Sequence, residues 1–161
     1  MAEILGLGMT HYPPLTGLDQ NMAGILRRVH VTASGPVVKW SRCQHQIFQS
    51  SPAIGDIGSD GRMEIVIGTG TGPSGDARAT NTLKAFHLSD GSRVPGWPVT
   101  LNGAIFGSPV LGDVNGDRKR DVVVAACARC NRGRVWAIGG RGKVLWSVAP
   151  GASQGAFTEI L

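Results

Sequence analysis

Short apolar runs, separated by turn-forming residues, follow one another along most of this chain. Ile65-Val66-Ile67 and Val122-Val123-Val124 are rich in β-branched residues and are flanked too closely by turns to be helices. Asp90-Gly91 is a strong hairpin signal between two such runs. The pattern therefore predicts units of four short strands, and in the first unit these cover residues 53–57, 64–68, 82–88 and approximately 94–101.

This unit occurs twice in the sequence. The run that begins Ser51-Pro52 recurs 57 residues later as Ser108-Pro109, and Trp40 recurs as Trp97 at the same offset. A single antiparallel sheet of four strands leaves both faces open, so such repeats must stack on one another, as the blades of a β-propeller do. The sequence thus predicts an all-β fold, a partial β-propeller of about two four-stranded blades with a short unrelated N-terminal segment.

The repeat also suggests how the chain is divided. Residues 1–34 are expected to be a separate N-terminal segment and residues 35–161 the propeller repeats. Within the latter we expect the end of a blade at 35–50 and two blades at 51–107 and 108–156. Closed propellers have roughly four to eight blades. We therefore expect the chain to be a fragment, or a truncated or fused gene product, that needs further blades to close a ring.

The turn between the first two strands of the second unit carries the clearest chemistry. Oxygen-bearing side chains fall at its first, third, fifth and ninth positions, and Gly116 allows the backbone to curl. Hard oxygen ligands in a tight loop suit Ca²⁺, which takes six to eight of them. The candidate Ca²⁺ ligands are Asp113, Asn115, Asp117, the backbone carbonyl of Lys119, and Asp121.

The corresponding turn of the first unit is a weaker candidate. It offers Asp56, Asp60, Glu64 and the backbone carbonyl of Arg62, but Gly58 at the third position has no side-chain oxygen, so a water molecule would have to serve there. An alternative explanation applies to both turns. Asp and Asn side chains also cap backbone amides in ordinary β-turns.

These motifs resemble the FG-GAP/VCBS repeats of integrin α-subunit-like β-propellers. The resemblance covers about residues 35–161 and includes the Ser-Pro strand, the Asp-rich turn and Gly96-Trp97-Pro98. It implies Ca²⁺ in the inter-strand turns and a non-catalytic role in adhesion or in binding protein or carbohydrate, usually outside the cytoplasm. Two residues depart from the family pattern, Gly58 at a ligand position and Arg118 where glycine is usual.

Residues 1–28 do not join the repeat and resemble the start of class III extradiol ring-cleavage dioxygenases. A strand is expected at residues 4–8, a turn at 11–14 and a short helix at 19–28. The resemblance implies that His11 binds non-haem Fe(II), although such a site needs two histidines and a carboxylate. An Fe(II) dioxygenase fragment is therefore an alternative function, and a junction of two gene pieces would explain both resemblances.

Two further constellations are weaker. Cys127 and Cys130 have the spacing of half a zinc knuckle, but no second pair of ligands is visible in the sequence. The run from Gly142 to Trp146 is similar to the blade ends of quinoprotein dehydrogenases, whose blades lack the Asp-rich turn. A quinoprotein-like propeller thus remains an alternative, and the turns favour the Ca²⁺-binding family.

Composition and charge limit the classes of partner that the chain could bind. The net charge of +5 and the pI of about 9.6 are compatible with a polyanion, but the basic residues are scattered and the aromatic residues lie in apolar runs. These features argue against a nucleic-acid partner. No apolar run is long enough for a membrane span, and the first residues lack the charged and apolar regions of a signal peptide.

Overall fold

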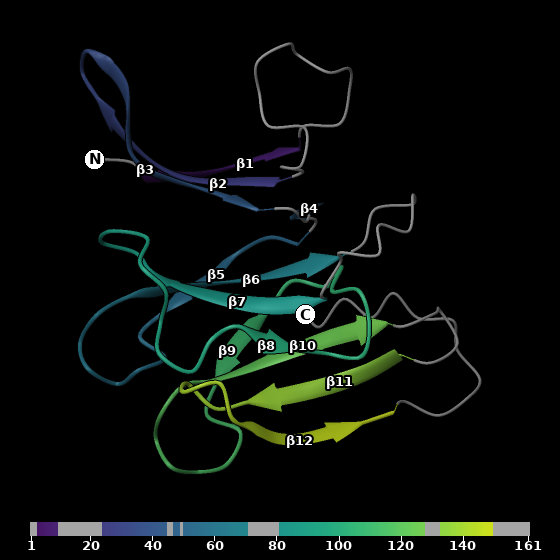
Figure 1. The fold of residues 1–161 in the computed structure, drawn as a ribbon. Coiled ribbons are helices and arrows are strands. Elements are labelled where there is room, and N and C mark those ends of the chain that lie inside the picture. The colour runs from purple at the N-terminus through teal and green to yellow at the C-terminus, as the bar shows by residue number, and fades with distance from the viewer. Residues whose placement is uncertain are drawn as a thin grey trace.

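The computed structural model describes residues 3–9, 24–44, 47–48, 50–70, 81–127 and 133–149. Within these ranges every regular element is a β-strand, and the strands form three antiparallel sheets. The predicted all-β class is confirmed, and the three open sheets agree with a partial propeller (Figure 1).

The first sheet contains β1 (Glu3–Met9), β2 (Gly24–Thr32) and β3 (Gly35–Gln44), in that order. The short helix expected over residues 19–28 is wrong for the described residues from Gly24 onward, which belong to β2. Pairing with β1 on one side and β3 on the other satisfies the backbone of this segment and outweighs its local helical propensity. The boundary expected between the N-terminal segment and the repeats, after residue 34, falls in the turn of the β2–β3 hairpin.

The second sheet is the first complete unit of the sequence. Both β4 and β5 pair with the same strand, β6, so they act as one interrupted edge strand, and β7 and β8 follow in order on the other side. The strands are β4 (Ile47–Phe48), β5 (Ala53–Gly55), β6 (Glu64–Gly70), β7 (Thr82–His87) and β8 (Val99–Thr100).

Three of the predicted strands in this unit are confirmed with small shifts at their ends, whereas the fourth is much shorter than expected. Regular pairing is limited to Val99–Thr100, preceded by an isolated bridge between Phe86 and Arg93. Pro95 and Pro98 lack an N–H to donate to β7, and Gly96 has a positive φ of 87°. These residues interrupt the strand.

The third sheet is a four-stranded meander with the order β9-β10-β11-β12. It repeats the β5-β6-β7-β8 arrangement of the second sheet, with a register irregularity between Ala137 and Ile138. Its strands are β9 (Val110–Gly112), β10 (Asp121–Cys127), β11 (Gly133–Ile138) and β12 (Val144–Val148).

The three sheets stack face to face (Figure 1). Side chains of β6 belong to two hydrophobic clusters, one on each face of the strand. Ile65 and Ile67 belong to the cluster that includes Leu26 of β2, whereas Val66 belongs to the cluster shared with the third sheet. Because side chains alternate across a strand, β6 is buried on both of its faces. Val122, at the equivalent place in the third sheet, is also fully buried.

The N-terminal sheet repeats the geometry of the sheet that follows it. In the first sheet Glu3 is paired with His30, and in the second Glu64 is paired with His87. The indole of Trp40 donates to the Leu88 carbonyl at 3.0 Å, and the indole of Trp97 donates to the Gly140 carbonyl at 2.9 Å. Each tryptophan therefore ties the end of its sheet to the turn between the last two strands of the next.

Candidate functional site

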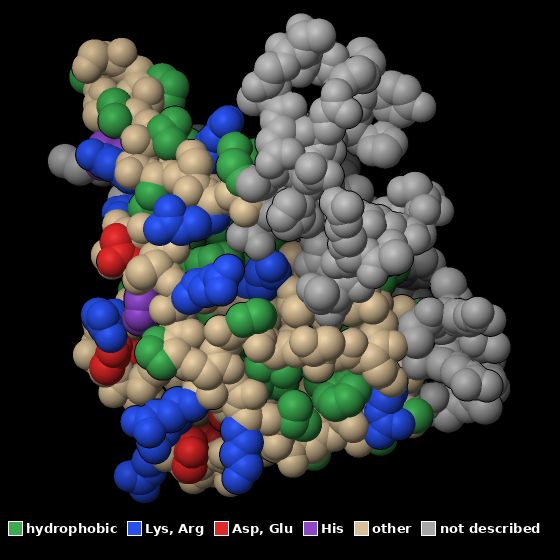
Figure 2. All heavy atoms as spheres, viewed as in Figure 1, with side chains coloured by type: hydrophobic (Ala, Val, Ile, Leu, Met, Phe, Trp, Pro, Cys, Tyr) green, Lys and Arg blue, Asp and Glu red, His purple; other side chains and the backbone are tan. Residues whose placement is uncertain are grey.

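The two Asp-rich turns occupy equivalent places in the second and third sheets. One connects β5 to β6 and the other connects β9 to β10, and both lie on the left-hand edge of the view in Figure 1. Figure 2 shows basic and acidic side chains interspersed along that edge. The turns hold all nine candidate Ca²⁺ ligands predicted from the sequence.

Both turns have the same backbone shape. Residues at the fourth and sixth positions are left-handed, with φ of 55° at Ser59 and 82° at Gly61 in the first turn, and 82° at Gly116 and 65° at Arg118 in the second. This conformation is unstrained for glycine and costs other residues roughly 1–2 kcal/mol. At these two positions each turn therefore has one glycine and one strained residue. The glycine is at the sixth position of the first turn and at the fourth position of the second.

The aspartate at the first position organises each turn. Asp56 accepts a hydrogen bond from the Gly61 N–H at 2.9 Å, and Asp113 accepts the equivalent bond from Arg118 at 2.8 Å and another from Gly116 at 2.7 Å. Backbone N–H donors favour the ionised carboxylate, and that from Arg118 contributes most to holding the pKa of Asp113 below its ordinary value. The carboxylate is thus an anionic centre around which the backbone curls.

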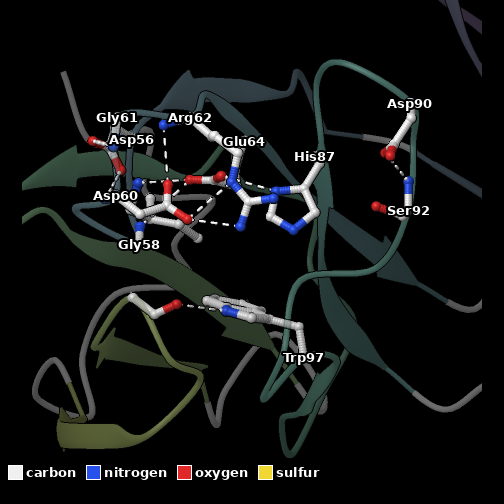
Figure 3. Close-up of polar contacts among 12 residues, drawn as sticks. Asp56, Gly58, Asp60, Gly61, Arg62, Glu64, His87, Asp90, Ser92 and Trp97 are labelled. Atoms are coloured by element: carbon white, nitrogen blue, oxygen red, sulfur yellow. Dashed lines mark hydrogen bonds and ion pairs between the residues drawn. The ribbon is translucent and has the colours of Figure 1, made fainter.

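At the fifth position the two turns begin to differ. The Asp60 carboxylate accepts the Arg62 N–H at 3.0 Å, and Asp117 accepts the Lys119 N–H at 2.8 Å. Arg62 also binds Asp60 through its guanidinium, with Nε at 2.9 Å and Nη2 at 2.7 Å from Oδ2 (Figure 3). These side-chain bonds hold the pKa of Asp60 below its ordinary value. Within the described residues, the Lys119 ammonium forms no such pair with Asp117.

The acidic residue at the ninth position is buried in both turns, with 1 % exposure for Glu64 and 2 % for Asp121. Glu64 accepts the Ile57 N–H at 3.0 Å through Oε2, and Asp121 accepts the Val114 N–H at 3.1 Å. Glu64 has a further partner, because its Oε1 lies 3.1 Å from Nδ1 of His87 (Figure 3). The first turn is thereby tied to the end of β7.

His87 was not among the residues singled out from the sequence. No local motif links it to Glu64, which lies 23 residues earlier. The two come together because they are paired across β6 and β7. A signal of this kind becomes visible only once the register of the two strands is known.

Two candidate ligands of the first turn have side-chain partners within the protein. Gly58 contributes no side-chain oxygen, and the Asp60 and Glu64 carboxylates already bind Arg62 and His87. The candidate ligands Asp56, Asp60, Arg62 and Glu64 are therefore gathered on one turn, but their oxygens are bound to protein donors.

The second turn retains the donor set that Ca²⁺ prefers, without a basic partner on it among the described residues. Its oxygens accept backbone N–H groups, as the capping alternative expects, including the Asp117 N–H at 2.9 Å on Asn115. In the described ranges no group of three or more His, Cys, Asp and Glu side chains is arranged to hold a metal ion. The ligands predicted from the sequence are on the turn, but they do not form a preassembled cage.

Two other predicted metal ligands cannot be placed. His11, the Fe(II) ligand implied by the dioxygenase resemblance, and Cys130, half of the zinc motif, lie outside the described residues. The structure therefore leaves the Fe(II) and zinc hypotheses as predictions.

Comparison with known proteins adds no relative. Neither a scan against protein-family models nor a search of curated proteins finds a match to the chain. In the part of the chain that the structure describes, no helix is long and apolar enough to cross a membrane. The geometry of the turns and of the sheets that hold them is thus what a functional proposal must rest on.

Proposed function

We propose that this chain is a segment of a β-propeller of the FG-GAP/VCBS type that acts as a non-catalytic binding scaffold, and that its second Asp-rich turn binds Ca²⁺. The observation that carries the proposal is the repetition of one turn in two stacked sheets, with equivalent carboxylate–amide bonds and equivalent left-handed residues. A turn that keeps the same backbone shape on two different sequences is a structural feature of the repeat, and one copy has the composition of a Ca²⁺ loop.

The contrast between the turns indicates which one binds the cation. Asp113 and Asp117 are exposed to solvent and have no basic side-chain partner within the described residues, whereas Asp60 has Arg62. A divalent cation bound at the second turn would relieve the repulsion between its carboxylates. Because those oxygens must first leave their backbone amides, we expect weak affinity, in the range of about 10⁻⁴–10⁻³ M that is typical of extracellular modules.

The stacking of the sheets supports the scaffold role and indicates a partner. Trp97 and Val99 are only 7 % and 8 % exposed because the third sheet packs on them. On the third sheet the outer strand β12 instead exposes Trp146 by 40 % and Val148 by 53 %. The face that a neighbouring sheet covers in one unit is open in the next, so we propose a further sheet of the same kind as its partner.

Titration with CaCl₂ at constant ionic strength tests the proposal, with MgCl₂ as the control for a non-specific salt effect. At ten times Kd, binding would stabilise the native state by about 1.4 kcal/mol and raise the melting temperature by about 3–6 °C. Asp117→Asn should abolish this rise because it removes a charged ligand of the second turn. The matched variant Asp60→Asn in the first turn should leave it intact.

Absence of both heat and a change in melting temperature at millimolar Ca²⁺ would overturn the assignment of the cation. If Asp60→Asn abolished the response and Asp117→Asn kept it, the cation would bind at the first turn, and our assignment to the second turn would be wrong. The scaffold role has a separate test, since it predicts no turnover of a catechol when the protein is loaded with Fe(II). Ring cleavage under those conditions would favour the dioxygenase alternative.

A further inference from the structure

A cavity of about 460 Å³ lies where the first Asp-rich turn meets the third sheet. It is lined by Asp60, Arg62 and Glu64 from the turn and β6, by His87 from β7, and by Arg141 from the turn between β11 and β12. Its volume is in the range of small-molecule sites, and it combines a few charged groups with apolar wall residues, as such sites do. The proposed Ca²⁺ turn contributes none of these residues.

Close backbone contacts between the sheets build the cavity. Gly140 lies against the Ile57 carbonyl and Gly96 against the Arg141 carbonyl, so closely that a Cβ atom at either glycine would collide with the opposite backbone. The indole of Trp97 donates to the Gly140 carbonyl at 2.9 Å (Figure 3). These contacts fix the turn that carries Arg141 against the first Asp-rich turn, so the cavity is a built feature of the sheet junction.

The carboxylates at the cavity are already satisfied by the protein. Asp60 Oδ2 accepts two hydrogen bonds from the Arg62 guanidinium. Glu64 Oε1 faces His87 Nδ1, and its Oε2 accepts the Ile57 N–H. Figure 3 shows these groups turned toward one another. The acidic groups are therefore poorly placed to bind a cationic or donor-rich ligand.

Guanidinium donors remain available to a ligand. The Arg141 side chain is exposed and makes no hydrogen bond or ion pair within the described residues. Arg62 uses Nε and Nη2 for Asp60, and Nη1 makes no hydrogen bond there. Arginine binds carboxylate and phosphate groups through paired N–H donors that are strengthened by charge. Val94 and Pro95 add apolar surface to the same wall.

We propose that this cavity binds a small organic anion, whose carboxylate or phosphate group is held by Arg141 and Arg62 and whose carbon skeleton lies against Val94 and Pro95. The ligand class follows from the residues that line the cavity: the carboxylates are already bound within the protein, whereas Arg141 and Nη1 of Arg62 have no hydrogen-bond partner among the described residues. The site is distinct from the proposed Ca²⁺ turn. It makes the first Asp-rich turn the wall of an anion site.

Calorimetric titration of the full chain at constant ionic strength tests this proposal. The probes are glucuronate for a carboxylate, glucose 1-phosphate for a phosphate, and glucose as the neutral control. At least one anion should bind with a millimolar or lower Kd, and glucose should not. Arg141→Gln should weaken the binding by about tenfold or more, because it removes a charge-assisted hydrogen bond.

The matched control is Arg118→Gln, which removes an equally charged side chain from the second turn, outside the cavity, and should leave the anion Kd unchanged. Arg62→Gln provides a second variant, whose folding is checked by its melting temperature. Binding of glucuronate alone identifies a carboxylate ligand, and binding of the phosphate ester alone identifies a phosphate ligand. Failure of both anions to bind at 10 mM, or equal binding by Arg141→Gln and the native protein, overturns the proposal.

Discussion

The two Asp-rich turns share a backbone but balance their charges differently. In the first, Arg62 binds Asp60 and His87 binds Glu64, so side chains of the protein are hydrogen-bonded to both carboxylates. In the second, Asp113 and Asp121 accept hydrogen bonds from backbone N–H groups, and no side chain of the described residues donates to them. The shape of such a turn is therefore set by its carboxylate–amide bonds, and its use as a cation site depends on which side chains surround it.

Strand register explains part of this difference. Glu64 is paired with His87 across β6 and β7. In the third sheet Val122 is paired with Ile138, so the residue opposite Asp121 is Gly139, which has no side chain to offer. The same backbone frame thus places an imidazole opposite one buried acid and a glycine without a side chain opposite the other.

The largest effect is expected from removing the buried acid of each turn. Glu64→Ala leaves His87 and the Ile57 N–H without their partner and should destabilise the protein by about 3 kcal/mol. Asp121→Ala removes one buried backbone bond and should cost about 1–2 kcal/mol. The free energy of unfolding from urea titration gives both values. Equal losses would mean that the His87 contact adds nothing and that the turns do not differ in this respect.

An intermediate effect is expected from exchanging glycine at the left-handed positions. Gly116→Ala and Gly61→Ala should each cost about 1–2 kcal/mol from backbone strain alone, because an added Cβ at either position meets no atom within 4 Å. Arg118→Gly and Ser59→Gly should instead stabilise the fold by about 0.5–1 kcal/mol. Melting temperatures of the four variants test these opposite effects: a decrease for the two alanine variants and an increase for the two glycine variants. A stabilising alanine at either glycine would show that the turns do not hold these backbone angles in solution.

The smallest effect concerns pH. Folding lowers the pKa of Asp113, so its contribution to stability is present above the pKa of the unfolded chain, about 3.8, and disappears as pH falls through the lower folded value. Asp113→Asn should therefore flatten the dependence of the melting temperature on pH below about 4, while lowering that temperature at neutral pH. A variant that keeps the native slope would show that backbone donors to Asp113 do not govern the acid response of the second turn.

The sequence determined much of the local structure. β-branched runs bounded by turn residues located β6 and β10, and the repeated Asp-rich segments located both turns. The fourth strand of the first unit was overestimated because two prolines and a left-handed Gly96 interrupt its pairing. One signal was overlooked, since Leu26 and Leu83 share the offset of 57 residues that also separates His30 from His87. These matches would have indicated a strand from Gly24 in place of a helix.

What the sequence by itself determined is therefore the presence of strands, turns and repeated acidic positions, because these depend on residues close together in the chain. The tertiary structure decided which partner each carboxylate has and where a cavity forms. The pairing of Glu64 with His87 depends on strand register, and the approach of Arg141 to the first turn depends on how two sheets pack. Such contacts join residues distant in sequence, so no local pattern records them.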